Sequence, residues 1–437
     1  MPKIALIGAG SIVFAKNLIT DLLLTQEIAD SLEISLVDID AYRLDKTLRM
    51  ARRMIEAQGS KAKVSASIDR KEALRGCRFV VTTIQVGGFD AYEKDLLIPR
   101  KYGVDQVVGD TIGPGGVFRL LRTAPVFRDI CRDMEEVCPG ALLMNYVNPM
   151  SMLTWAVHRM SGVACVGLCH SVQGVNNRIA EHLEAQGSEI VCRVGGINHL
   201  SWVTECTYRG QDAYPLLREA MKKPEVYRKD IPRFEMLKTW GAFICESSWH
   251  VSEYVPYFRK SKEWVEKINH MDDPWSAWGG DMLALVRDRQ DDFYADLDRQ
   301  IDGEVSFQMV RSIEYGANIV RAMETGVAYA IAGNVMNTGL ITNLPEGCCV
   351  EVPCLVDNRG ITPCHFGSLP PHLASLCRSH IAVHELAVEA AVIGDKEALL
   401  HAVLLDPLAG SVLTMDSGAA MVKEMLEAHK DMLPQFA

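Results

Sequence analysis

The sequence predicts an α/β protein in which a doubly wound, mostly parallel sheet is followed by a second, mixed α+β domain. Through the first 190 residues, short apolar runs alternate with segments of helical period, which is typical of a parallel sheet covered by helices. Beyond that point, helix-rich and strand-like segments mix without a repeat or a low-complexity linker. We therefore expect two tightly packed domains, residues 1–190 and 191–437.

The expected parallel sheet is built from short apolar strands. These lie at residues 4–7, 32–37, 63–66, 78–84, 141–146 and 164–168. Between them, apolar residues at helical spacing predict helices at residues 14–24, 41–58 and 118–138. In the helix at 41–58 the predicted buried stripe is Leu44, Leu48, Ala51 and Ile55.

The second domain is expected to combine strands with longer helices. Residues 191–208 have a strand-like pattern. Residues 346–369 are rich in Cys, Pro and Gly and contain β-branched runs, which predicts strands and loops. Helices are expected within residues 216–239, 275–299, 305–325 and 372–433. Gly326 is well placed to end the helix at 305–325, because glycine adopts the left-handed backbone of a helix C-terminus without steric cost.

Composition narrows the class of protein. The chain has 437 residues, 48% of them apolar, so it can bury a large core. Its net charge is −11 and it has no basic block, which excludes general binding to nucleic acid or to an anionic membrane. No apolar run reaches the ~18 residues of a membrane span, and the stretch before Gly8 is too short for a signal peptide. We expect a cytoplasmic enzyme.

The cysteines are expected to be reduced and mostly buried. There are 13, which is an odd number, and the sequence has no export signal, so a disulfide framework is not expected. The sequence also lacks a pair of CxxC units, so a zinc ribbon is not expected. Cys348, Cys349 and Cys354 resemble a metal motif at first sight. Alternation along a strand separates Cys348 from Cys349 and Glu351, so this segment favours a structural strand with buried thiols.

The first strand leads into a candidate dinucleotide site. Gly8-Ala9-Gly10 with Ser11 follows a strand and opens a helix, so its backbone could approach a pyrophosphate, as in a Rossmann-type domain. Asp38 ends the next strand, where an acid would accept from ribose hydroxyls and favour NAD over NADP. The third glycine of the usual motif is absent, since Val13 takes its place. The alternative is an α/β domain with a tight turn.

Two further segments could hold a metal and its substrate. The glycine-dense loop at residues 108–116 carries Asp110, which could accept from sugar hydroxyls, although the loop could also be an irregular crossover. Cys169-His170 ends a predicted strand and Asn198-His199 follows one unit later. A thiolate and an imidazole could hold a divalent metal with open positions for substrate oxygens, and the alternative is a buried thiol with a core histidine.

Residues 246–254 group an acid, an imidazole, an indole and a phenol. His250 and Tyr254 are candidates for proton transfer, and Trp249 could stack on a sugar face. The alternative interpretation is an exposed capping loop.

Together these motifs resemble glycoside hydrolase family 4 over nearly the whole chain, and most closely its bacterial branch that cleaves melibiose-type α-galactosides. The motifs that carry the resemblance are Ile7-Gly8-Ala9-Gly10-Ser11, Val37-Asp38-Ile39-Asp40, Asp110-Thr111-Ile112-Gly113-Pro114-Gly115-Gly116, Asn145-Tyr146-Val147-Asn148-Pro149-Met150, Gly167-Leu168-Cys169-His170-Ser171-Val172-Gln173-Gly174, Gly196-Ile197-Asn198-His199 and Asn343-Leu344-Pro345-Glu346-Gly347-Cys348-Cys349-Val350-Glu351-Val352.

The resemblance implies a role for each matching position. Cys169 and His199 correspond to the protein ligands of a catalytic Mn²⁺ or another divalent metal, and Asn148 to a sugar-hydroxyl contact beside it. His170 stands where some relatives carry an acid that assists the leaving group. The residues that correspond to the NAD⁺ site are Gly8, Gly10, Ser11 and Asp38.

The resemblance also implies a redox route that departs from the two-carboxylate scheme of most glycosidases. NAD⁺ takes a hydride from C3 of the sugar, a base removes the C2 proton, and the aglycone leaves C1 by elimination. Water then adds and the hydride returns, so the cofactor is not consumed. The base comes from the segment around Tyr254 or His250.

One departure leaves the sugar open. Related α-galactosidases tend to have a glutamate where this chain has Trp249. A galacturonide would need a cation for its carboxylate, and Arg259 and Lys260 are near in sequence, so α-galacturonidase and α-glucosidase remain alternatives.

Other classes of function share the two-domain plan. An NAD-dependent hydroxy-acid dehydrogenase of the lactate/malate type would need no metal at Cys169 and His199, and a non-catalytic NAD-binding sensor would need no turnover at all. In each case the expected partner is a small molecule. A homodimer or homotetramer is expected.

Overall fold

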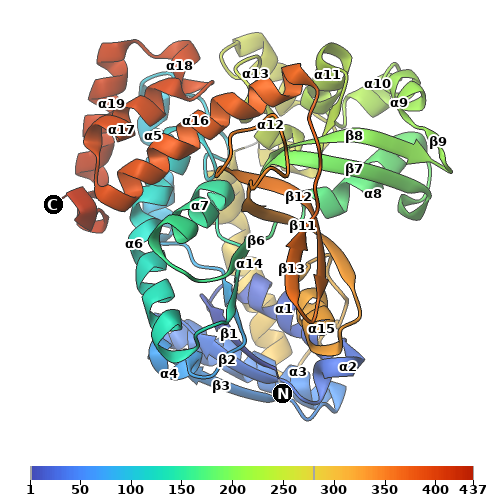
Figure 1. The fold of residues 1–437 in the computed structure, drawn as a ribbon, viewed down its shortest axis with the longest axis vertical. Coiled ribbons are helices and arrows are strands. Elements are labelled where there is room, and N and C mark those ends of the chain that lie inside the picture. Colours follow the sequence, from blue (N-terminus) through green and yellow to red (C-terminus); the bar gives the residue numbers. More distant parts are fainter. Residues whose placement is uncertain (1, 279–280, 437) are drawn as a thin grey trace.

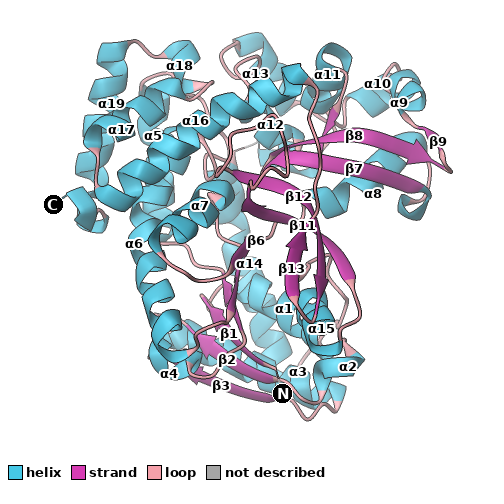
Figure 2. Ribbon diagram, in the orientation of Figure 1, coloured by secondary structure: helices cyan, strands magenta, loops and turns pink. Residues whose placement is uncertain are grey.

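A computed structural model describes residues 2–278 and 281–436, and its centre is a single mixed sheet. The sheet order is β10-β8-β7-β12-β11-β6-β5-β4-β1-β2-β3, with β13 and β9 pairing on β12 and β8. Figure 2 shows the strands crossing the molecule from β3 to β8 with helices on both sides. Both expected halves of the chain therefore contribute to one sheet.

The first half forms the predicted parallel sheet. Its strands are β1 (Lys3–Ile7), β2 (Glu33–Val37), β3 (Lys63–Ser67), β4 (Phe79–Thr82), β5 (Leu142–Asn145) and β6 (Cys165–Gly167). All neighbouring pairs are parallel, in the order 3-2-1-4-5-6. This order is that of a dinucleotide-binding doubly wound fold, so the predicted fold class is confirmed.

Helices of this half cover the sheet on both faces. They are α1 (Ile12–Leu23), α2 (Gln26–Ala29), α3 (Ala41–Gln58), α4 (Arg70–Leu74), α5 (Gly88–Lys101), α6 (Gly113–Val137), α7 (Met150–Met160) and α8 (Ser171–Leu183). In α3, Leu44 and Ala51 are buried as predicted, and Leu48 and Ile55 are partly buried against the same core. Asp40 begins this helix by accepting from the Tyr42 and Arg43 backbone N–H groups.

The second half extends the sheet through antiparallel pairs. Its strands are β7 (Ile190–Ile197), β8 (Leu200–Tyr208), β9 (Gln211–Asp212), β10 (Phe243–Ile244), β11 (Tyr329–Met336), β12 (Cys349–Asp357) and β13 (Gly360–Pro363). Asn334 on β11 pairs with Gly167 on β6, which joins the two halves. The strands expected within 191–208 and 346–369 are confirmed.

The helices of the second half surround this extension. They are α9 (Tyr214–Ala220), α10 (Pro224–Tyr227), α11 (Ile231–Trp240), α12 (Ser248–Tyr254), α13 (Lys262–Asn269), α14 (Met282–Asp302), α15 (Gly316–Thr325), α16 (Pro371–Ile393), α17 (Lys396–Leu405), α18 (Ala409–Val412) and α19 (Met415–His429). The C-terminal helices α16, α17 and α19 lie against α5, α6 and α7 of the first half (Figure 1).

One expected helix is shorter than predicted. Residues 305–315 are not helical, and α15 begins only at Gly316, although Gly326 does end it with left-handed backbone. Phe307 and Met309 alternate toward the core, and the Ser312 backbone and side chain bind Asp21. These tertiary contacts hold an extended segment, so the prediction for 305–315 was wrong. Of the helix expected at 275–299, residues 279–280 lie outside the described part.

The cysteine prediction needs one correction. All 13 thiols are free, and most are buried, including Cys348, Cys349 and Cys354. Cys364 is exposed, however, and Cys192 is half-buried. The structure therefore confirms a set of mostly buried thiols without disulfides, but Cys364 is not a packing residue.

In the described part of the chain, no helix combines the length and apolar character needed to cross a membrane.

Candidate functional site

The predicted site residues converge where the parallel strands end. Gly8 follows β1, Thr83 follows β4, and Cys169 lies two residues beyond β6. Carboxyl ends of adjacent parallel strands meet at one edge of a sheet, which is where doubly wound folds bind ligands.

The turn after β1 has the geometry expected of a dinucleotide loop. Gly8 has φ +90°, and a Cβ there would lie 2.8 Å from the Thr83 backbone. A Cβ on Gly10 would lie 2.8 Å from the Asp38 carboxylate, so Gly8 is sterically required and a side chain at Gly10 would displace the carboxylate of Asp38. Asp38 accepts from the backbone N–H groups of Gly10 (2.7 Å) and Asp40 (2.9 Å). Its oxygens keep further lone pairs for ribose hydroxyls.

Three donor groups form a cluster that we call the Cys169 cluster: Cys169, His199 and Glu246. Their ligand atoms all lie within 4.8 Å of one another. His199 Nε2 lies 3.5 Å from the Cys169 sulfur and 3.2 Å from a Glu246 oxygen. Thiolate, imidazole and carboxylate are all ligands of divalent transition metals, so these residues fit such an ion.

Each member of the Cys169 cluster comes from a different element. Cys169 follows β6, Glu246 follows β10, and His199 lies in the two-residue turn that joins β7 to β8. His199 has φ +62°, an uncommon conformation for a side chain that is not glycine. Non-glycine residues in this region often lie at functional sites.

Protonation differs sharply within the Cys169 cluster. Burial raises the pKa of the Cys169 thiol, and the Glu246 and Glu351 carboxylates raise it further. Burial would also raise the pKa of Glu246, but the imidazoles of His199 and His250 lower it to about 2. Metal binding would therefore have to displace a proton from the thiol.

A second group of polar residues adjoins the Cys169 cluster. Asp110 accepts from Asn148 Nδ2 (3.0 Å) and from Thr111 Oγ1 (2.7 Å), and lies 3.8 Å from His250 Nε2. Burial would raise the pKa of Asp110, but His250 and the Arg119 guanidinium hold it below its ordinary value. The structure thus brings together Asp110 and Asn148, two residues that were each expected to contact the substrate.

His250 bridges the two groups. Its Nδ1 lies 3.0 Å from Ser247 Oγ and 3.6 Å from Glu246 Oε1, and its ring centroid is 4.5 Å from that of His199. The segment was expected to be either a site or an exposed capping loop. It is the buried helix α12, and the exposed interpretation was wrong.

Tyr254 and His170 are the remaining candidates for proton transfer near the Cys169 cluster. The Tyr254 ring is 6.0 Å from that of His199, and its buried hydroxyl has no hydrogen-bond partner among the described residues. Burial raises the pKa of Tyr254 well above its ordinary value, and Asp110 and Glu246 add to the effect. His170 keeps 60% of its side chain exposed, with Nδ1 3.7 Å from a Glu314 oxygen.

The stacking role expected of Trp249 needs correction, and the cations considered for a uronic acid are placed by the structure. Trp249 is 1% exposed and its indole N–H donates to Asp273 at 3.1 Å, so it does not present an open stacking face. Arg259 donates through Nε to the Asp105 carbonyl at 2.9 Å and through Nη2 to the Asp105 carboxylate at 2.6 Å. Of the two cations considered for a uronic acid, Arg259 is therefore paired with Asp105, and Lys260 is exposed.

Two buried acids were not assigned site roles from the sequence. Glu246 is the first residue of the segment 246–254, but its position in the sequence does not link it to Cys169 or His199. Glu351 is 1% exposed and accepts from Ser201 (2.5 Å) and Asn334 (3.1 Å). Glu351 was expected on a structural strand. Only the presence of a charged residue within an apolar run could have indicated that it belongs to a site.

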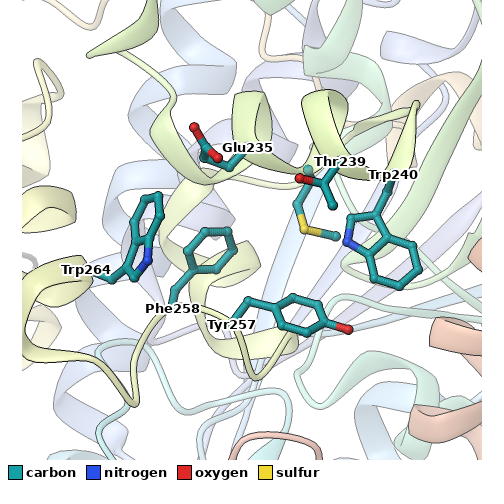
Figure 3. Close-up of a pocket in the computed structure, with 7 residues that line it drawn as sticks. Glu235, Thr239, Trp240, Tyr257, Phe258 and Trp264 are labelled. Atoms are coloured by element: carbon teal, nitrogen blue, oxygen red, sulfur yellow. The ribbon is translucent and has the colours of Figure 1, made fainter.

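A separate cavity of about 250 Å³ lies on α11 and the segment after α12. Figure 3 shows its aromatic wall, formed by Trp240, Tyr257, Phe258 and Trp264. None of its lining residues belongs to the predicted site.

Comparisons with known proteins identify the family. Residues 3–185 match family 4 glycosyl hydrolases, and residues 194–409 match the C-terminal domain of that family. An α-galactosidase of Bacillus subtilis is 39% identical over 100% of both chains, and one of Rhizobium meliloti is 38% identical over 100% of this chain and 90% of its own.

A solved structure agrees with the fold. It is a 6-phospho-β-glucosidase from Thermotoga maritima with manganese, NAD⁺ and glucose-6-phosphate, and it aligns at a TM-score of 0.82 and 23% identity, over 98% of this chain and 99% of its own. The chain therefore belongs to family 4 of the glycosyl hydrolases and is a glycoside hydrolase.

Proposed function

We propose that this enzyme is an α-galactosidase that uses NAD⁺ and a divalent metal such as Mn²⁺. The observation that carries the proposal is the Cys169 cluster, which lies beside Asp110 and Asn148 and holds three metal donors within 4.8 Å. The full-length similarity to two α-galactosidases supports galactose as the sugar.

The proposed dinucleotide site is the turn after β1. The backbone N–H groups at Gly10 and Ser11 and the start of α1 would face the pyrophosphate, and Asp38 would accept from the adenosine ribose. A negative carboxylate at Asp38 disfavours the additional phosphate of NADP.

The proposed metal ligands are Cys169 and His199, with Glu246 as a third donor. When bound, NAD⁺ would accept hydride from the sugar and the metal would polarise the sugar oxygens. Three protein donors leave positions open for substrate, as in other catalytic metal sites. Asn148 and Asp110, joined at 3.0 Å, would hold the sugar hydroxyls next to these positions.

Tyr254 and His250 are both candidates for the base that removes the C2 proton. The Tyr254 hydroxyl and His250 Nε2 are each buried without a hydrogen-bond partner among the described residues, and His250 Nδ1 contacts Ser247. Because burial and nearby carboxylates raise the pKa of Tyr254, its deprotonation would depend on positive charge bound in the same pocket. His170 would give a proton to the leaving oxygen, and Glu314 would orient its ring.

The described residues favour a neutral sugar over a uronic acid. Of the two cations considered for a sugar carboxylate, Arg259 is paired with Asp105 and Lys260 is exposed. Asp110 and Glu246 add negative charge to the pocket, which would repel a carboxylate.

We also propose that the enzyme is a homodimer or homotetramer. Sedimentation would measure the size of the assembly. The division of the chain into two domains at residue 190 stays a prediction.

The test is turnover of 4-nitrophenyl α-galactoside with catalytic NAD⁺, Mn²⁺ and a reductant, beside the matching α-glucoside and α-galacturonide. We expect the galactoside to be the preferred substrate without net NADH. Cys169→Ser should abolish turnover, whereas Cys165→Ser, at a buried thiol that begins β6, the strand before Cys169, should retain it. Stoichiometric NADH would instead indicate a dehydrogenase.

A further inference from the structure

The loop that carries Asp110 is attached to α12 by one buried carboxylate. Glu253 is 2% exposed and lies on α12 beside Tyr254. Its Oε1 accepts from the backbone N–H groups of Val107 and Val108, each at 2.5 Å, and its Oε2 accepts from that of Gly109 at 3.0 Å. Three successive N–H groups aimed at one anion form a nest, which the loop's own backbone cannot satisfy.

The loop is held from other directions as well. The Gln106 side chain donates to Glu253 at 3.3 Å and to the Ile112 carbonyl at 3.1 Å. The Tyr92 hydroxyl donates to the Val108 carbonyl at 2.6 Å. Arg100 donates to the Gln106 carbonyl at 2.9 Å, and Asp406 accepts from the Gly113 N–H at 3.1 Å, so both ends of the loop have anchors of their own. Glu253 accepts from the three backbone N–H groups between these ends, so we expect the conformation of residues 107–109 to depend on it.

The next residues of the loop connect Glu253 to the Cys169 cluster. Thr111 Oγ1 donates to Asp110 at 2.7 Å and lies 3.3 Å from His199 Nδ1. Because the threonine proton is directed to Asp110, its oxygen is free to accept from His199 Nδ1–H. With Nδ1 as the donor in that hydrogen bond, the Nε2 lone pair would face Cys169 and Glu246, where the proposed function places the metal.

We infer that Glu253 is a positioning residue, which holds the 107–111 loop so that Thr111 fixes the orientation and tautomer of His199. It acts through the loop and touches none of the Cys169 cluster itself. The inference rests on the proposed function only where it assigns a metal to His199. Outer groups that orient a ligating histidine affect metal affinity by about 10–100-fold.

The first measurement needs no metal and no substrate. Amide hydrogen exchange in the metal-free full chain would compare wild type with Glu253→Gln, which preserves side-chain length but directs an amide toward the Gly109 N–H. We expect exchange in residues 105–112 to be about tenfold faster, with little change elsewhere. The matched control is Asp133→Asn, a mostly buried acid that pairs with Arg70 at the far end of α6.

The second measurement is a double-mutant cycle on Mn²⁺ affinity. Glu253→Gln and Thr111→Val should each raise the Kd for Mn²⁺ about tenfold, and the double variant should be little weaker than either single one. A merely structural role for Glu253 would give effects that multiply. Asp133→Asn should leave the Kd within about twofold of wild type.

The outcomes separate the inference from the proposed function. Unchanged exchange at residues 105–112, loss of protection spread over the whole chain, or multiplying Kd effects would each overturn the role of Glu253. Absence of Mn²⁺ binding in wild type would count against the proposed function, and the exchange result would still decide whether Glu253 holds the loop. If Glu253→Gln does not fold, Tyr92→Phe releases the same loop at Val108 and should give the same pattern.

Discussion

Two buried clusters of charged groups adjoin each other and differ in how completely their charges are balanced. The first, which we call the Asp230 network, consists of Asp230, His182, Arg233 and Ser248. Asp230 is 2% exposed and accepts from His182 (2.9 Å), Arg233 (3.0 Å) and Ser248 (2.7 Å). The second is the Cys169 cluster, in which a thiol and a carboxylate face one imidazole.

The contrast separates a stabilising role from a binding role. In the Asp230 network a guanidinium neutralises the acid, and Arg233 also donates to the Cys245 and Glu246 carbonyls, each at 2.5 Å. That network therefore supports the backbone that presents Glu246. In the Cys169 cluster the donors converge without a guanidinium among them, and a cation from outside would complete the set.

Removing the acid of the Asp230 network should have the largest effect on stability. Asp230→Ala leaves the buried Arg233 without its carboxylate and should lower the free energy of unfolding by about 3–5 kcal/mol. Denaturant titration measures this loss. Asp272→Ala removes an exposed acid that pairs with Arg228, and should cost at most about 1 kcal/mol. Equal losses in both variants would contradict the distinction.

Acid should weaken the same network. Burial would raise the pKa of Asp230, but Arg233 and His182 hold it below its ordinary value. The resulting stability is present above the ordinary aspartate pKa of about 4 and is lost as the pH falls through the lower folded value. Thermal unfolding measured from pH 7 downward should show the loss, and Asp230→Asn should flatten it. An unchanged acid slope in that variant would argue against this assignment.

The Cys169 cluster should respond in metal affinity more than in stability. Glu246→Gln removes the third proposed donor and should raise the Kd for Mn²⁺ by about 10–100-fold, while the metal-free protein stays folded. Titration calorimetry and unfolding in a chelator measure the two quantities. Glu235→Gln is the matched control, because Glu235 binds Tyr227 outside the cluster. A normal Kd in Glu246→Gln would leave only Cys169 and His199 as protein ligands.

The sequence predicted those features that depend on local pattern. Gly8-Ala9-Gly10 is a turn between a strand and a helix, and Cys169 follows a short apolar strand, so both could be placed at the same sheet edge in advance. The end of α15 at Gly326 could also be predicted from the local sequence. Each depends on residues within a few positions of itself.

Other features depend on contacts between distant segments. Glu246 reaches His199 only after β10 pairs with β8, and Glu253 reaches Val107 only after α12 packs against the first half. The sequence spacing of these residues predicts neither contact. Residues 305–315 have apolar residues that suit a helix, yet Ser312 and Met309 are held by groups near residue 20. Tertiary contacts outweigh helix propensity there.

The smallest predicted effect is at Asp38 in the dinucleotide turn. This side chain accepts from the backbone of the turn and would also contact the ribose. Asp38→Asn retains an acceptor for the Gly10 N–H but removes the charge that would face the ribose. We expect NAD⁺ to bind about tenfold more weakly and NADP⁺ to lose less, because repulsion of its extra phosphate is relieved. Fluorescence titration with both nucleotides measures the ratio. Asp40→Asn, at the neighbouring helix cap, should leave that ratio unchanged, and an equal shift in both variants would mean that Asp38 acts on the turn alone.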